Sequence, residues 1–334
     1  MSARMRKEAR WDGHRAQDRE VADMHAHMSR RMFLTAATGL TAAWLPRWSE
    51  AQRAKTRLVL LGTGGGPRPN KVSMSSALVI IVNDVLYVVD CGNGVARQLV
   101  IAGASLQKLR HVFITHHHSD HNAGYGNLLL LSWAGGLRTQ VDTWGPPPID
   151  KITRLFFEMS TYDIDARIAD EGRVPLVPLI HVHELTQPGV ILRDESMKVT
   201  CALVDHPPVS PAFAYRFDTA DRSIVTSGDT NRSGNLVKLA QGADVLVHEA
   251  LYVPAVDRLV ARNPNAATLK KHIIDSHTSV EDCGRVAAAA GVKTLVLSHR
   301  VPSDDPTITE QMWIAAARQH FKGEIIVARD LMEI

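Results

Sequence analysis

The chain has 334 residues, of which 45% are hydrophobic and 22% are charged. These proportions are ordinary for a folded globular protein and exclude a disordered or fibrous chain. The chain holds 38 basic residues (Lys and Arg) and 35 acidic residues (Asp and Glu), of which nine basic and six acidic residues lie in residues 1–51. Residues 52–334 therefore hold 29 of each and carry no net charge. A neutral domain lacks the overall charge of a general nucleic-acid binder, so we expect a small-molecule substrate rather than nucleic acid.

The first 51 residues have the pattern of a secretory signal. A polar stretch rich in arginine leads to Arg30-Arg31-Met32-Phe33-Leu34 and the apolar stretch 35–45, and Ser49-Glu50-Ala51 offers small residues where a signal peptidase cleaves. The paired arginines resemble the twin-arginine export signal; a chance Arg pair or a helix lying on a membrane are the alternatives. We expect residues 1–51 to be cleaved and residues 52–334 to be exported as one domain to the periplasm or beyond. No apolar run reaches the roughly 18 residues that cross a bilayer, so we expect no stable membrane insertion.

Apolar stretches and turn signals predict the elements of the domain in chain order. Residues 161–190 are expected to hold several short strands, and Thr278 and Glu281 have the spacing of a capping box at a helix start. Strands are expected over residues 57–61, 76–82, 85–89, 111–115, 141–144, 198–204, 213–217, 223–227, 245–247, 292–297 and 325–327. Helices are expected over residues 95–102, 122–131, 150–160, 236–241, 279–290 and 308–321.

Four of the expected strands end directly in histidine or aspartate. The residues that follow these strands are His116, His206, Asp229 and His299. Because strand ends in an α/β sheet share one edge, where ligands bind, we expect these side chains to meet there.

The run His116-His117-His118-Ser119-Asp120-His121 has the chemistry of a metal site. In an extended segment alternate residues point the same way, so His116 and His118 can reach one cation while His117 points elsewhere. Asp120 and His121 lie just beyond and can reach a second cation. Imidazole and carboxylate donors suit Zn²⁺, Mn²⁺ or Fe²⁺. A histidine-rich surface tract is the alternative interpretation.

The order of these motifs resembles the metallo-β-lactamase superfamily. The run above, then His206, then Ser227-Gly228-Asp229-Thr230, then Ser298-His299 is similar to that family over about residues 56–330. The resemblance implies an α/β fold, the αββα sandwich of two mixed β-sheets flanked by helices. It also implies two divalent cations, zinc favoured over manganese or iron, and a metal-bridging hydroxide oriented by Asp120 and Asp229. By the resemblance, His116, His118 and His206 hold one cation, Asp120, His121 and His299 hold the other, and Asp229 bridges them.

Two further motifs resemble the RNase Z-like and phosphodiesterase-like branch, which includes arylsulfatase-like enzymes. They are Val247-His248-Glu249-Ala250 and His277-Thr278-Ser279. The resemblance implies that His248 lies by the metals and gives a proton to the leaving oxygen, so the expected catalytic residues are Asp120 and His248. For His277, at the start of a helix, we favour a structural role. The branch contains dimers, so a homodimer is compatible with the resemblance.

One departure from the RNase Z pattern shapes the expected function. Those enzymes carry a long tRNA-holding arm between the third-motif histidine and the bridging aspartate, but His206 and Asp229 are only 23 positions apart. We therefore expect a phosphodiesterase or a related phosphate or sulfate ester hydrolase. RNase Z-type cleavage of RNA and opening of lactone or β-lactam rings stay as alternatives. A redox role at iron and a non-enzymatic metal-binding module are disfavoured by the complete ligand set.

Overall fold

The structure is a computed structural model and describes residues 56–334. The expected export signal, residues 1–51, lies outside the described residues. Residues 56–334 form one compact unit. In the described part, no helix has the length and apolar character needed to span a membrane.

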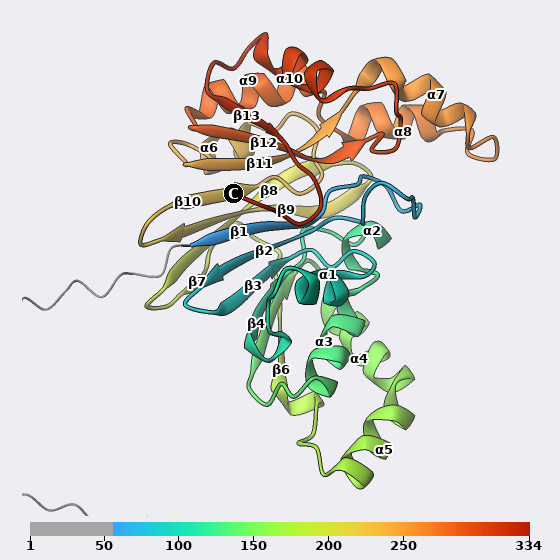
Figure 1. The fold of residues 1–334 in the computed structure, drawn as a ribbon, viewed down its shortest axis with the longest axis vertical. Coiled ribbons are helices and arrows are strands. Elements are labelled where there is room, and N and C mark those ends of the chain that lie inside the picture. The colour runs from blue at the N-terminus through green and yellow to red at the C-terminus, as the bar shows by residue number, and fades with distance from the viewer. Residues whose placement is uncertain (1–55) are drawn as a thin grey trace, which may run out of the picture. The chain divides into compact units, whose positions relative to one another are not determined.

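The unit is built on two seven-stranded sheets, seen nearly edge-on in Figure 1. The first has the order β14-β1-β2-β3-β4-β5-β6; its pairs from β14 to β3 are antiparallel and those from β3 to β6 are parallel. Its strands are β1 (Arg57–Gly62), β2 (Ala77–Val82), β3 (Val85–Val89), β4 (Leu109–Phe113), β5 (Val141–Gly145), β6 (Ile180–Glu184) and β14 (Met332–Glu333).

The second sheet has the order β13-β12-β11-β10-β9-β8-β7 and is also mixed. Its pairs from β13 to β10 are parallel, and those from β10 to β7 are antiparallel. Its strands are β7 (Gly189–Arg193), β8 (Met197–His206), β9 (Val209–Thr219), β10 (Ser223–Thr226), β11 (Val245–Leu251), β12 (Thr294–Val301) and β13 (Glu324–Val327).

Helices cover the outer face of each sheet. Helices α1, α3 and α4 pack on the first sheet, and α6, α9 and α10 pack on the second. This arrangement confirms the expected αββα sandwich. The helices are α1 (Val95–Ile101), α2 (Ser119–Asn122), α3 (Tyr125–Ala134), α4 (Ile149–Met159), α5 (Thr161–Glu171), α6 (Gly234–Leu239), α7 (Val256–Ala261), α8 (Leu269–Ser276), α9 (Val280–Ala290) and α10 (Glu310–Arg318).

Strand β1 shows why its sequence is a continuous apolar run. Alternate residues of a strand point to opposite faces, and both faces of this sheet are covered. Leu58 and Leu60 lie in the core between the sheets, whereas Val59 and Leu61 lie in the core under the helices. Between the sheets, Phe113 stacks on Trp144 at 5.0 Å between ring centroids. Full burial of such a side chain contributes about 1.5–3 kcal/mol to folding.

The structure differs from the sequence prediction in several places. Residues 161–171 form helix α5 rather than short strands, because Ile164 and Ile168, one helical turn apart, both pack against the core of the first sheet. Helices α7 and α8 and strands β7 and β14 were not predicted. Ser279, rather than Thr278, caps α9: its hydroxyl accepts a hydrogen bond from the backbone N–H of Asp282.

Candidate metal centre

The expected metal ligands gather where several strands end at one edge of the sandwich. His206 is the last residue of β8, Asp229 follows β10, and His299 lies near the end of β12. His116 and His118 follow β4, and Asp120 and His121 lie on the single turn of α2. Except for the half-buried His118, each of the seven side chains is at most 5% exposed.

The first donor group consists of His116, His118, His206 and Asp229. The Nδ1 atom of His118 lies 3.0 Å from Nε2 of His116 and 3.1 Å from Nε2 of His206. The Oδ2 atom of Asp229 is 3.9 Å from Nε2 of His116. His117 points away from this group, as expected, and its Nε2–H donates to the carbonyl of Pro146.

The second donor group consists of Asp120, His121, His299 and, again, Asp229. The Nε2 atoms of His121 and His299 are 3.2 Å apart, and each lies 3.3 Å from Oδ2 of Asp229. Asp120 places Oδ2 at 3.2 Å from Nε2 of His299. Since Oδ2 of Asp229 lies near both groups, it occupies the position of a bridging donor.

A β-bulge directs His299 into the second group. The register between β11 and β12 shifts after Glu249 opposite Ser298, so His299 has no partner of its own across the ladder. Its φ of 39° lies in the left-handed region, which a residue other than glycine adopts only when its surroundings demand it. Bulges of this kind reorient a side chain at functional sites.

Hydrogen bonds to the far side of each ring fix where the protons sit. Asp90 accepts from Nδ1–H of His121 at 2.7 Å, and the carbonyl of Ser276 accepts from Nδ1–H of His206 at 2.9 Å. The hydroxyl of Thr115 donates to Asp90, so it must accept from Nδ1–H of His116. The Nε2 atoms of His116, His121 and His206 therefore face the centre, as in rings oriented for metal binding.

The donor set fits divalent cations for a second reason. The Oδ1 atom of Asp229 is buried and has no hydrogen-bond partner within residues 56–334, a costly state unless another group binds it. Burial lowers the pKa of His116 and His206, and together with the nearby His206 it brings the pKa of His118 to about 4. These three rings are thus neutral near pH 7, as metal ligands must be.

The carboxylates and His121 attract each other strongly. Burial by itself raises the pKa of Asp229, but the charges of His121 and His299 outweigh it and hold that pKa well below the usual range. Burial lowers the pKa of His121, and the charges of Asp229 and Asp90 outweigh burial and raise it. The second group is therefore rich in negative charge, which a bound cation would neutralise.

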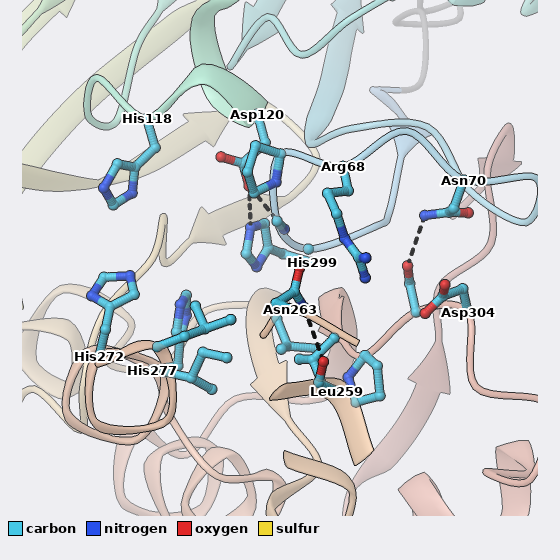
Figure 2. Close-up of a pocket in the computed structure, with 18 of the residues that line it drawn as sticks. Arg68, Asn70, His118, Asp120, Leu259, Asn263, His272, His277, His299 and Asp304 are labelled. Carbon is cyan, nitrogen blue, oxygen red and sulfur yellow. Dashed lines mark hydrogen bonds and ion pairs between the residues drawn. The ribbon is translucent and has the colours of Figure 1, made fainter. Parts of the chain in front are cut away.

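The two groups open into a cavity of about 500 Å³, shown in Figure 2. The loop that carries Arg68 and Asn70 lines one side of this cavity, and residues of α7, α8 and the segment between them line the opposite side. His118, Asp120 and His299 lie on its inner wall. The volume is in the range of pockets that hold small molecules or one unit of a larger substrate.

His248 does not lie in this cavity, contrary to expectation. Successive residues of β11 face opposite sides, and His248 lies with Leu246 and Ala250 on the side of helix α9. It is fully buried, and its Nδ1 lies 3.8 Å from Sγ of Cys283 in that helix. The predicted role of His248 beside the metals is wrong for this geometric reason.

His277 and Glu249 occupy the place expected for His248. His277 lines the cavity, and its Nδ1 lies 3.3 Å from Oε1 of Glu249 and 3.9 Å from Oδ2 of Asp229. Burial lowers the pKa of His277, but the charge and hydrogen bond of Glu249 outweigh it and raise the pKa to about 9. The helix-start position of His277 favoured a structural role; the sequence signal for a role at the site is its place in the motif His277-Thr278-Ser279.

Comparisons with known proteins agree with this geometry. The model of the beta-lactamase superfamily domain matches residues 86–300. A Ribonuclease Z of Mycobacterium bovis (strain BCG / Pasteur 1173P2) is 33% identical over 280 residues, which cover 83% of this chain and 97% of that protein. The structure of human tRNase Z, short form (ELAC1), has a TM-score of 0.61 at 22% identity and covers 83% of this chain and 98% of its own. The metallo-beta-lactamase fold protein YhfI of Bacillus subtilis has a TM-score of 0.61 at 19% identity, covering 84% and 98%.

Proposed function

Since this chain belongs to the metallo-β-lactamase superfamily and is an RNase Z-like, metal-dependent hydrolase, we propose that it cleaves phosphodiester bonds of RNA. The observation that carries the proposal is the pair of buried donor groups joined by Asp229 at the base of an open cavity. The chain spans almost the whole of a relative named Ribonuclease Z, which supports the RNA-cleaving alternative over the small-substrate interpretation.

Two divalent cations would occupy the donor groups. His116, His118 and His206 would hold one, Asp120, His121 and His299 the other, and Asp229 would lie between them. Zinc suits this set of imidazole and carboxylate donors best, with manganese or iron as alternatives. When bound, such a pair makes water acidic enough to attack at neutral pH and stabilises negative charge on the phosphate.

Asp120 has the geometry to orient the attacking water. Its Oδ2 accepts a hydrogen bond from the backbone N–H of Gly66 at 2.9 Å and lies beside His299. Its Oδ1 has no hydrogen-bond partner in the described chain and remains available to accept a proton from water. The catalytic assignment of Asp120 is therefore kept.

His277 replaces His248 as the residue that protonates the leaving oxygen. Glu249 holds its Nδ1 side, and the same Oε1 atom accepts backbone N–H bonds from Thr230 and Thr278. This leaves Nε2 of His277 for the substrate, on the wall of the cavity. A positioned imidazole of this kind contributes roughly 10²–10⁴-fold to a proton-transfer step.

A second candidate function is the hydrolysis of small phosphodiesters or sulfate esters. It is favoured by the segment between His206 and Asp229, which consists of β9 and β10 within the sheet and leaves no room for an arm that holds a long RNA. The two candidates share the same metal-binding residues and differ in the substrate, which is RNA in the first and a small phosphate or sulfate ester in the second.

Metal-loaded protein should be assayed with bis(p-nitrophenyl) phosphate, with a tRNA precursor that has a 3′ extension, and with p-nitrophenyl sulfate. RNA cleavage that Asp229→Asn abolishes, and that a surface control such as His181→Ala preserves, would support the proposal. Activity on the small esters alone would favour the second candidate. Activity of equal size in Asp229→Asn and the parent protein would contradict both.

Export by the twin-arginine route stays a proposal that rests on residues 1–51. A fusion of these residues to a reporter that folds in the cytoplasm tests it. Transport that Arg30→Lys with Arg31→Lys abolishes would support export, and retention of the parent fusion in the cytoplasm would contradict it.

The homodimer also stays a proposal. Light scattering of the purified protein tests it, since the measured mass separates one chain from two.

A further inference from the structure

His272, on helix α8, faces the cavity beside the first donor group. Its ring centroid lies 5.9 Å from that of His118, 6.2 Å from that of His206 and 6.1 Å from that of His277. Figure 2 shows the His272 ring pointing toward His118 across the opening of the cavity. None of the motifs in the sequence includes this residue, and neither proposed metal group needs it.

The hydrogen bonds of Ser276 determine which nitrogen of His272 carries the proton. The Ser276 hydroxyl donates its one hydrogen to the carbonyl of Pro207. Its oxygen, which lies 3.2 Å from Nδ1 of His272, must then accept from that nitrogen. The neutral ring therefore keeps a lone pair on Nε2, and no residue of the described chain donates to it.

Ser276 also connects His272 to the metal group. Its carbonyl accepts from Nδ1–H of His206, while its hydroxyl holds His272 one helical turn earlier. The acceptor at Nε2 of His272 is thus fixed relative to the position where the scissile phosphate would lie. A fixed acceptor recognises a hydroxyl or amine donor, and it is unfavourable for a bare phosphate oxygen.

Several other polar groups on the cavity wall are already engaged. The carboxylate of Asp304 pairs with both terminal nitrogens of Arg262, at 3.0 Å each, and the amide nitrogen of Asn263 donates to the carbonyl of Leu259. The amide oxygen of Asn70 accepts two backbone N–H groups of its own loop. His272 therefore offers an unengaged acceptor close to the metal-binding residues.

We propose that Nε2 of His272 accepts a hydrogen bond from the ribose 2′-hydroxyl next to the scissile phosphate, and so selects ribonucleotide over deoxyribonucleotide substrates. The inference rests on the proposed RNA-cleaving function and adds the residue that selects the ribonucleotide. The 2′-hydroxyl is the group by which proteins distinguish RNA from DNA.

The test compares two dinucleotides that contain one phosphodiester bond each. They are uridylyl-(3′→5′)-uridine and its counterpart without the 2′-hydroxyl of the first nucleoside. We expect kcat/KM of the metal-loaded parent protein to be about tenfold higher for the ribonucleotide, the value of one good hydrogen bond. In His272→Leu the ratio should fall to near one, and His272→Gln, which restores an acceptor, should recover part of it.

Two further variants separate recognition from a structural effect. Ser276→Ala removes the hydroxyl that holds His272 but keeps the carbonyl that holds His206, so it should lower the ratio while the protein still binds two metals. His181→Ala, on the exposed face of β6, should keep the parent ratio. Bound metal should be measured in each variant, because His272 lies near His118.

A parent ratio near one, or a ratio that His272→Leu leaves unchanged, would overturn the inference. So would hydrolysis of bis(p-nitrophenyl) phosphate without any hydrolysis of the dinucleotides, which would leave the second candidate, hydrolysis of small phosphodiesters, standing. Metal-loaded protein that hydrolyses none of these phosphodiesters would instead contradict the proposed function itself.

Discussion

The carboxylate of Asp90 lies 2.7 Å from Nδ1 of His121 and orients that ring toward the second donor group. The same carboxylate accepts the backbone N–H of Thr115 at 2.8 Å and its hydroxyl at 3.0 Å, and so also determines the proton position on His116. One buried carboxylate thereby orients one histidine of each donor group without belonging to either.

The Asp90→Asn substitution tests this relationship. An amide offers hydrogens where a carboxylate only accepts, so it would oppose Nδ1–H of His121. Loss of such an outer hydrogen bond costs about 10–100-fold in metal affinity. Competition with a chromogenic chelator should show that loss for Asp90→Asn, whereas Asp142→Asn, at the one partly exposed position of strand β5, should retain the parent affinity. Equal affinities in both variants would contradict the assignment.

The role of His277 predicts an effect that depends on the leaving group. His277→Gln should lower kcat for an alkoxide leaving group, as in RNA, by roughly 10²–10⁴-fold, because that oxygen needs a proton. Loss for a p-nitrophenolate leaving group, which departs without a proton, should be far smaller. A uniform loss for both substrates would indicate a structural role for His277.

His248 should behave differently, because its ring faces α9 rather than the cavity. His248→Gln should change kcat by less than tenfold for either leaving group and should act mainly on the thermal midpoint of unfolding. A loss in kcat as large as that of His277→Gln, with an unchanged thermal midpoint, would restore the original expectation for His248.

Gly228, just before Asp229, should not tolerate a side chain. Its φ is 59°, and an added Cβ would lie 2.8 Å from the carbonyl oxygen of Phe213 and 2.9 Å from Cβ of Thr115. Gly242 provides a matched control, since its φ is 66° but an added Cβ would meet nothing within 4 Å. Gly228→Ala should therefore lose more stability than Gly242→Ala, whose backbone strain alone costs about 1–3 kcal/mol. Urea unfolding of both variants measures the difference, and equal losses would refute the close approach.

Removal of metal should destabilise the native state. A ligand that binds only the folded chain at a free concentration 100 times its Kd adds about 2.7 kcal/mol to stability. Chelator-treated protein should therefore unfold at a temperature several degrees lower, and added zinc should reverse the change. An identical calorimetric midpoint with and without metal would argue against occupied sites in the folded protein.

The fold and the donor groups could be predicted because their signals are local. Strands such as β1 are uninterrupted apolar runs, and His116, His206, Asp229 and His299 lie at or just beyond the C-terminal ends of apolar stretches. Strand ends at a shared edge then bring them together, whatever the details of the loops.

The parts that were missed depend on contacts that no local pattern reveals. Helices α7 and α8 are six and eight residues long and lie on the cavity wall, so their stability comes from packing rather than from sequence period. His272 belongs to no motif, and its importance becomes visible only beside Ser276 and His118. The prediction for His248 was wrong because successive residues of β11 face opposite sides. His248 therefore faces helix α9, and its neighbour Glu249 faces the metal-binding residues.

The most direct measurement is a titration of chelator-treated protein with zinc while hydrolysis of bis(p-nitrophenyl) phosphate is followed. The rate should rise until about two equivalents are bound per chain, as expected for a two-metal site, and Asp229→Asn should abolish the rise. Full activity before any metal is added, or a chain that binds none, would contradict a metal-dependent hydrolase with paired cations.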